Sequence, residues 1–147
     1  MPPIMRKINI ISRCQGIFRA NNLQNDELTP CHHSYILAIT HNPGITQDEL
    51  AKSICVNKSN VTRTLVYLEK NGYVERKPSP SDKRAIQVFP TQKMQEIFPK
   101  IKQIVIDWNT YLTKDLSDEE MEIFQSVLEK ISERAKNYIE NKGGDKL

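Results

Sequence analysis

The chain has 147 residues, of which 27% are charged and 38% hydrophobic, and its formal net charge is +3. This length suits one domain with its own core, or a protomer that completes its core on a partner. No apolar run is long enough to span a bilayer and no secretion signal is seen, so we expect a cytoplasmic protein without a membrane segment. Three cysteines without short paired spacing argue against a disulfide framework.

Two helices are expected before the middle of the chain. Residues 4–22 carry isoleucines and a phenylalanine among polar residues, which predicts an amphipathic helix. A second helix is expected to begin near Thr29 and Pro30, because a cap residue followed by proline is typical of a helix start. The Asn-Pro-Gly run at 42–44 ends it and leads into Ile45, which could add one short strand.

The next stretch, residues 46–70, predicts two short helices across a tight turn. The first opens at Thr46 with Glu49 three residues later, which forms a capping box. The second opens at Asn57, a good N-cap residue. Apolar residues give both helices inner faces that can pack together as a helix-turn-helix. They are Leu50, Ala51, Ile54, Val56, Val61, Leu65 and Leu68.

The second of these helices has the opposite chemistry on its outer face. Such a face supplies hydrogen-bonding groups for base edges and cations for phosphates. The same residues also suit an ordinary solvated helix face, so the pattern needs support from elsewhere. They are Lys58, Ser59, Asn60, Thr62, Arg63 and Thr64.

A basic hairpin is expected to follow this helix. Gly72 ends the helix, and residues 73–77 and 85–89 read as two strands joined by a polar loop. From Lys58 to Arg84 the chain has seven Lys or Arg against three Asp or Glu, although its total charge is only +3. This concentration of positive charge on one helix and one hairpin tip indicates a DNA-binding winged helix.

Residues 91–113 and 117–141 are expected to form two long helices. Ser117 begins the second with Glu120 in another capping box. Apolar residues then recur at alternating steps of three and four, at Met121, Phe124, Leu128, Ile131, Ala135 and Tyr138. One small winged domain cannot cover all of these faces, so we expect a homodimer, with an intramolecular helical layer as the alternative.

The stretch LAKSICVNKSNVTRTLVYLEKNGYVERKPSPSDKRAIQVFPT resembles the core of the MarR family, the multiple-antibiotic-resistance-type regulators. The similarity includes the wing signature Asp-x-Arg, here Asp82 and Arg84, and the order of the flanking helices fits over nearly the whole chain. Two departures are visible. Cys55 stands at the turn position where helix-turn-helix proteins favour Gly, and Pro90-Thr91 replaces the usual Leu-Thr.

The resemblance implies a fold that is mainly α with a small antiparallel β wing. Residues 1–147 are then a single protomer, with a winged helix-turn-helix at 29–90 flanked by dimerisation helices at 4–22 and 91–141. The implied function is a sequence-specific transcriptional regulator of double-stranded DNA. A ligand-responsive repressor that binds a pseudo-palindromic operator as a homodimer is expected.

The contacts to DNA can be assigned as hypotheses. Arg63 is the best candidate for a bidentate guanine contact in the major groove. Arg84, held by Asp82, is similar to the family's wing arginine and is expected in the minor groove, while the other hairpin cations supply phosphate charge. The full set of expected DNA-binding residues is Asn57, Lys58, Ser59, Asn60, Thr62, Arg63, Thr64, Arg76, Lys77, Lys83 and Arg84.

The signal that such a regulator senses is less defined by the sequence. MarR-type regulators often bind small aromatic or phenolic molecules in a crevice between the dimerisation helices and the winged domain. The same aromatic side chains could simply fill the core. The candidate lining is Arg13, Phe18, Arg19, Tyr35, Trp108 and Tyr111.

Redox and metal sensing are the alternatives to such an effector. Cys14 lies in the first expected helix, where some family members sense hydroperoxides, but Arg13 is the only cation beside it in sequence and an inert thiol is the other reading. A superficial metal cluster consists of Cys31, His32, His33 and His41. Zinc-responsive relatives take ligands from the helix after the wing, which has no histidine here, so no metal or cofactor is expected.

Two other function classes are alternatives to a regulator. A non-specific or architectural DNA-binding protein is the first, and footprinting separates it from a regulator, which protects one discrete palindrome. An enzyme is not expected, because the sequence shows no nucleophile with an adjacent base, no glycine-rich phosphate loop and no carboxylate pair.

Overall fold

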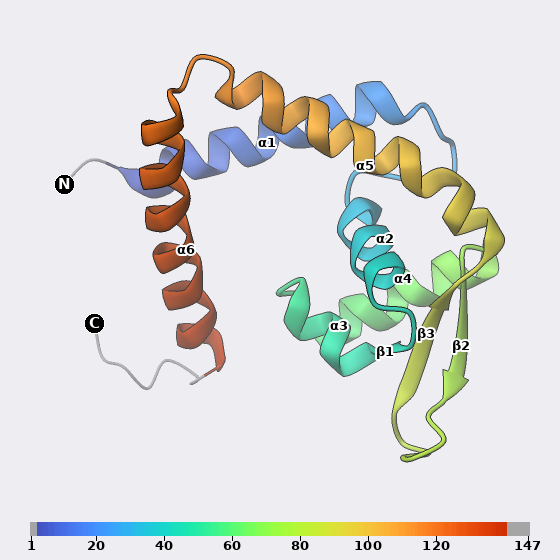
Figure 1. The fold of residues 1–147 in the computed structure, drawn as a ribbon. Coiled ribbons are helices and arrows are strands. Elements are labelled where there is room, and N and C mark those ends of the chain that lie inside the picture. The colour runs from blue at the N-terminus through green and yellow to red at the C-terminus, as the bar shows by residue number, and fades with distance from the viewer. Residues whose placement is uncertain (1–2, 141–147) are drawn as a thin grey trace. The chain divides into compact units, whose positions relative to one another are not determined.

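The computed structural model describes residues 3–140, which form six helices and one small antiparallel sheet (Figure 1). The elements are α1 (Ile4–Leu23), α2 (His32–His41), β1 (Ile45–Thr46), α3 (Gln47–Ser53), α4 (Lys58–Lys70), β2 (Val74–Pro78), β3 (Ile86–Pro90), α5 (Gln92–Thr113) and α6 (Asp118–Glu140). The expected mainly α fold with a β wing is confirmed. Across the described residues, no helix is both long and apolar enough to cross a membrane.

The chain divides into two compact units, Met1–Trp108 and Asn109–Leu147. The first holds the helix-turn-helix, the sheet and most of α5, and the second holds the end of α5 and α6. The winged region at 29–90 lies inside the first unit, and its boundaries stay a prediction. Residue 141, the last of the expected dimerisation helices, lies outside the described residues.

The core of the first unit is built on the inner faces of α2, α3 and α4. These faces meet β3 and α5, and they exclude water completely at several apolar side chains. The predicted inner faces of the helix-turn-helix are therefore confirmed at their central positions. The apolar residues with 0% exposure are Ile36, Ile39, Leu50, Val61, Leu65, Leu68, Val88, Met94 and Ile101.

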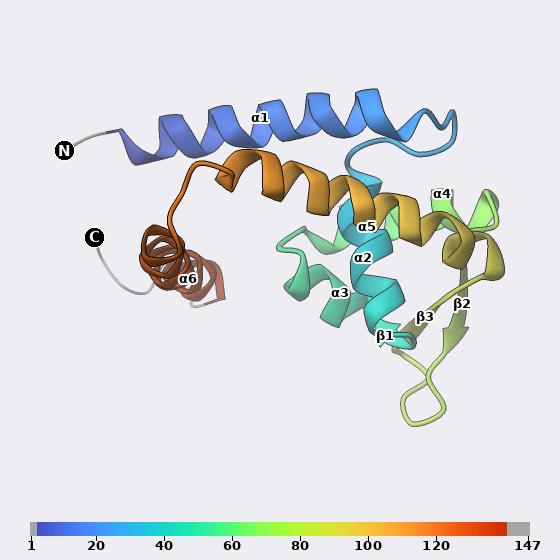
Figure 2. The same ribbon diagram turned by 45° about the horizontal axis from the view of Figure 1, so that its top comes forward.

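The sheet has the order β1-β3-β2, with both pairs antiparallel. Ile45 pairs with Val88, so the expected short strand exists and adds to the free edge of β3. Both hairpin strands begin one residue later than predicted. The reason at β2 is that the Tyr73 N–H donates to the Leu68 carbonyl at 2.8 Å, which places Tyr73 in the turn that follows α4. In Figure 2 the β2–β3 hairpin protrudes beyond the helices of its unit.

The predicted capping boxes form at both helix starts. At α3 the Thr46 hydroxyl accepts the Glu49 N–H at 3.2 Å, and the Glu49 carboxylate accepts the Thr46 N–H at 2.9 Å. That backbone hydrogen bond is the main cause of a lowered pKa of Glu49. Ser117 and Glu120 exchange the same two bonds at α6, at 3.2 and 2.9 Å. Each box satisfies two N–H groups that a helix start otherwise leaves unpaired.

The start of α2 differs from the prediction, because the helix begins at His32 and not near Thr29 and Pro30. The preceding residues form a turn in which the His32 N–H donates to the Thr29 carbonyl at 3.0 Å. The imidazole Nδ1 of His32 in turn accepts the Thr29 N–H at 3.1 Å. This side chain closes the turn locally and so delays the helix.

His33, one residue further, is a buried histidine in the first unit. Its side chain has 0% exposure, and neither ring nitrogen has a hydrogen-bond partner in the described part of the chain. Burial lowers the pKa of His33 from 6.5 to about 4, and the charges of Arg19 and His32 act in the same direction. The folded protein therefore holds this side chain neutral between about pH 4 and 6.5, where a histidine in an unfolded chain becomes protonated.

The burial of His33 predicts acid sensitivity. As the pH falls below 6.5 the unfolded chain gains a proton at this position, while the folded chain gains none until about pH 4. Stability is lost across this window, at up to about 1.4 kcal/mol per pH unit from this residue. His33→Leu should remove that share, so its free energy of unfolding by urea should fall less steeply than wild type between pH 6.5 and 4.5. Parallel curves for the two proteins contradict the prediction.

Candidate nucleic-acid interface

The turn between α3 and α4 sets the angle between the two helices. The Val56 N–H donates to the Ala51 carbonyl at 3.0 Å and the Cys55 N–H to the Lys52 carbonyl at 3.2 Å, the two bonds of a Schellman motif. Cys55 has φ 53, so it adopts the left-handed conformation that favours glycine. The cysteine at this position thus occupies the geometry of the glycine that such turns favour.

Helix α4 has one buried side and one exposed side. Val61, Leu65 and Leu68 face the core with 0% exposure. On the outer side the predicted residues are exposed at Asn57, Lys58, Ser59, Thr62 and Arg63, and partly exposed at Asn60 and Thr64. The structure therefore brings the seven predicted residues of this helix and its cap to one accessible surface.

The start of α3 contacts this surface through two residues that the sequence reasoning missed. The Asp48 carboxylate pairs with the Lys58 ammonium at 2.8 Å, and the Gln47 amide donates to the Thr62 hydroxyl at 3.5 Å. Asp48 was visible as an acidic residue in a first helical turn, but nothing in the sequence indicated its partner ten residues later. Gln47 and Asp48 are additional candidates for the interface.

The hairpin loop is ordered by Asp82. Its carboxylate accepts the backbone N–H of Arg84 at 2.9 Å, and its carbonyl accepts the Ala85 N–H at 2.9 Å. The Ser79 N–H closes the loop on the Ala85 carbonyl at 2.8 Å. Asp82 thus positions the backbone of Arg84 and leaves the exposed guanidinium free of a carboxylate partner from its own loop.

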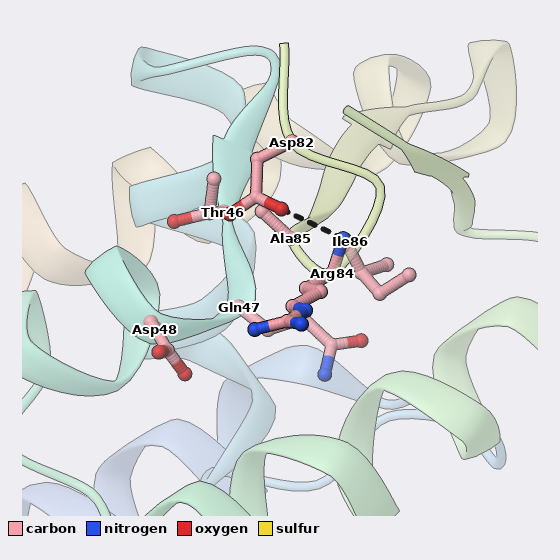
Figure 3. A pocket seen from close by; sticks show the side chains of 7 residues that line it. All are labelled: Thr46, Gln47, Asp48, Asp82, Arg84, Ala85 and Ile86. Atoms are coloured by element: carbon pink, nitrogen blue, oxygen red, sulfur yellow. Dashed lines mark hydrogen bonds between the residues drawn. The ribbon is translucent and has the colours of Figure 1, made fainter. Parts of the chain in front are cut away.

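An open pocket of about 210 Å³ lies between the loop and the start of α3 (Figure 3). In this view the Arg84 side chain extends toward the α3 residues of the lining. The hairpin arginine and the start of the helix-turn-helix therefore line the same pocket. Its lining is Thr46, Gln47, Asp48, Asp82, Arg84, Ala85 and Ile86.

Two further hairpin cations are paired with carboxylates. The Arg76 guanidinium donates to the Glu69 carboxylate through Nε at 3.0 Å and Nη2 at 2.6 Å, and the Arg76 side chain is only 23% exposed. These bonds lower the pKa of Glu69. Lys77 pairs with Glu75 at 2.9 Å, and both of those side chains are exposed. Arg76 therefore connects β2 to the end of α4. This structural role was not predicted from the sequence.

The six candidates for an effector pocket do not share one environment. The rings of Phe18 and Trp108 are in contact, with centroids 5.1 Å apart. Arg19 is partly buried, and burial lowers its pKa, whereas Arg13 is exposed. Tyr35 is only 4% exposed within the main core, which favours its alternative role as a core residue. The sixth candidate is Tyr111, which belongs to the second unit and is 63% exposed.

The cysteines and histidines of the described residues do not form a metal-binding group. Cys14, Cys31 and Cys55 are free and exposed. The His41 ring nitrogen lies 2.6 Å from the Leu37 carbonyl oxygen. Within residues 3–140, no three His, Cys, Asp or Glu side chains are grouped so that they could hold a metal ion.

Known proteins provide an independent comparison. A model of the MarR family matches residues 28–86. The transcriptional regulator YybA of Bacillus subtilis is 27% identical over 131 residues, which cover 89% of this chain and 87% of that protein. A crystal structure of MarR is 30% identical with a TM-score of 0.80, and the match covers 95% of each chain.

The chain belongs to the MarR family. It is therefore a transcriptional regulator and not an enzyme, as the sequence predicted. A MarR-family regulator from Listeria monocytogenes, solved in complex with a 26mer DNA, is 26% identical with a TM-score of 0.90. That match covers 100% of this chain and 99% of the Listeria chain.

Proposed function

We propose that this MarR-family regulator is a ligand-responsive repressor that binds a pseudo-palindromic operator as a homodimer. The observation that carries the mode of DNA binding is the division of α4 into a fully buried apolar side and an exposed polar side. A helix of this kind fits the major groove, where its polar side chains reach base edges. The DNA complex of the similar Listeria protein supports the proposal.

The proposed contacts are to base edges, to the minor groove and to phosphates. Arg63 contacts a guanine, and Ser59 and Thr62 approach neighbouring base edges from the same exposed side. Arg84 enters the minor groove, where a narrow A·T-rich segment attracts a guanidinium. Phosphate contacts come mainly from the exposed cations, while the pairing of Arg76 with Glu69 gives Arg76 a smaller part.

The proposal of a homodimer rests on apolar surface that the single chain leaves uncovered. None of the described residues of α6 is buried. The predicted stripe on α6 is exposed at Phe124, Leu128, Ile131 and Tyr138, by 40 to 49%. Large uncovered apolar patches are uncommon on monomers. A second copy would bury this surface and place two α4 helices on half-sites about one turn of DNA apart.

The proposed effector is a small aromatic or phenolic acid. Phe18 and Trp108 present adjacent rings, and the partly buried Arg19 guanidinium lies in the same unit. A ring of the ligand would pack against these aromatic side chains while its carboxylate binds the guanidinium.

The DNA contacts can be tested with two arginine variants. Arg63→Ala should weaken operator binding about 10- to 100-fold and relax the preference at one base pair, because one bidentate contact contributes about 1–3 kcal/mol. Arg84→Ala should weaken binding to all sequences. It should also reduce the slope of log affinity against log salt concentration by about one, because one positive charge is lost from the interface. Fluorescence anisotropy with labelled duplexes at several salt concentrations measures both effects. Lys102→Ala, at an exposed lysine of α5, is the matched control. Wild-type affinity in both arginine variants contradicts the proposed contacts.

The homodimer can be tested by placing a charge on the α6 stripe. Wild type should have twice the 17.0 kDa chain mass in analytical ultracentrifugation. Leu128→Glu should shift it toward the monomer. Each buried leucine contributes about 1.5–3 kcal/mol, and a twofold interface contains two copies of Leu128. Gln125→Glu adds the same charge outside the stripe and should leave the dimer intact. A monomeric wild type at micromolar concentration overturns the proposal.

The effector can be followed through the intrinsic fluorescence of Trp108, the only tryptophan of the chain. Hydroxybenzoic acid should change this emission and release the operator over one concentration range, and Arg19→Gln should move both curves to higher concentration. In a promoter reporter the same compound should raise expression if the protein is a repressor. Acetate is the non-aromatic control. Unchanged emission and retained operator at millimolar hydroxybenzoate count against the proposal.

A further inference from the structure

The first turns of α4 contain a chain of side-chain hydrogen bonds. The Asn57 side-chain oxygen accepts the backbone N–H of Asn60 at 2.8 Å and the Ser59 hydroxyl at 2.9 Å. The Asn60 side-chain oxygen in turn accepts a hydrogen bond from Nη2 of Arg63. The helix cap is therefore connected, through the backbone and side chain of one asparagine, to the guanidinium proposed to contact a guanine.

Helical geometry makes this last contact a local one. Residues three apart lie next to each other on a helix surface, and long side chains lean toward the helix N-terminus. Arg63 thus points back along α4 to Asn60 by its own preferred direction. Since the guanidinium has five N–H donors in a planar fork, one hydrogen bond to Asn60 leaves another edge available for two parallel bonds.

We infer that Asn60 is a specificity-determining residue that acts through Arg63. It holds the guanidinium in one orientation before DNA binds, so that the free edge of the guanidinium can contact O6 and N7 of a guanine. The entropy cost of ordering the arginine side chain is then not added to binding. This inference rests on the proposed DNA-binding function and deepens it, because it names Asn60 as the positioning residue of one base contact.

The main competing role for Asn60 is direct recognition of a base. An asparagine that reads adenine uses its side-chain oxygen and its amide nitrogen together. In this structure the oxygen already accepts a hydrogen bond from Arg63, which uses one of its two lone pairs, so an adenine would have to share this acceptor with the guanidinium. The two roles predict losses at different base pairs, which allows them to be separated.

The test uses the full chain and an operator obtained by selection from a randomised duplex pool. Each base pair of one half-site is then exchanged in turn, and affinities are measured for wild type, Asn60→Ala, Asn60→Asp, Arg63→Ala and the double alanine variant. Gln95→Ala, at an exposed amide of α5, is the matched control. Thermal unfolding of every variant is recorded, so that a loss of folding is recognised separately.

Asn60→Ala should weaken operator binding about fivefold, as expected for one side chain that must now be ordered on binding. The lost preference should fall at the base pair that Arg63→Ala affects, with no further loss in the double variant. The salt dependence should stay at its wild-type value, because no charge is removed. Asn60→Asp keeps an acceptor for Arg63, so it should retain the ratio of affinities between guanine and other bases even if its overall affinity falls.

Three results overturn the inference. Asn60→Ala could lose preference at a base pair that Arg63→Ala leaves unchanged, which assigns direct base reading to Asn60. The two alanine effects could multiply in the double variant, which shows independent residues. Asn60→Ala could also bind as wild type at every base pair. Failure of the proposed DNA contacts is distinguishable, because Arg63→Ala itself then has wild-type affinity.

Discussion

The orientation of α4 depends on three side chains that are completely excluded from water. Val61, Leu65 and Leu68 have 0% exposure, and burial of each contributes about 1.5–3 kcal/mol. A hydrogen bond between exposed polar groups contributes about 1 kcal/mol or less, so polar contacts cannot rotate the helix against this apolar contact. The polar side of α4 therefore faces outward because its apolar side is fixed in the core. Core packing thus sets the orientation of the proposed DNA-binding face.

The wing takes its direction from the last turn of α4. Gly72 has φ 77, a conformation that reverses the chain at little cost only for glycine. The Thr91 hydroxyl lies 2.6 Å from the Gly72 carbonyl oxygen, so the start of α5 is attached at the point where the hairpin leaves the helix. Arg76 and Glu69 then connect the first strand back to α4. These contacts join the hairpin to the end of α4, and in the proposed interface they would keep both DNA contacts in register.

The sequence predicted features that depend on neighbours in the chain and missed those that depend on the fold. The capping box of Thr46 and Glu49 spans three residues, so its pattern was readable directly. Arg76 was expected to supply phosphate charge, and the structure pairs it with Glu69, because the reversal of the chain brings β2 back along α4. His33 stood in an apparent metal cluster, yet it is buried in the first unit, where neighbouring helices decide its exposure. The outer face of α4 was predictable, but the hydrogen bonds among its residues were not.

The same pairings also indicate which cations are available to phosphates. Lys58 and Asp48 are 71% and 64% exposed, and an exposed pair of this kind contributes at most about 1 kcal/mol, so exchange of the carboxylate for a phosphate costs little. Arg76 is 23% exposed and donates two side-chain hydrogen bonds to Glu69, so the same exchange there would break a better-shielded contact. The positive charge counted along the sequence therefore overstates the charge free for DNA. In the proposed interface, electrostatic attraction falls mainly to the cations at the start of α4 and at the tip of the hairpin, which are the two parts that must enter successive grooves.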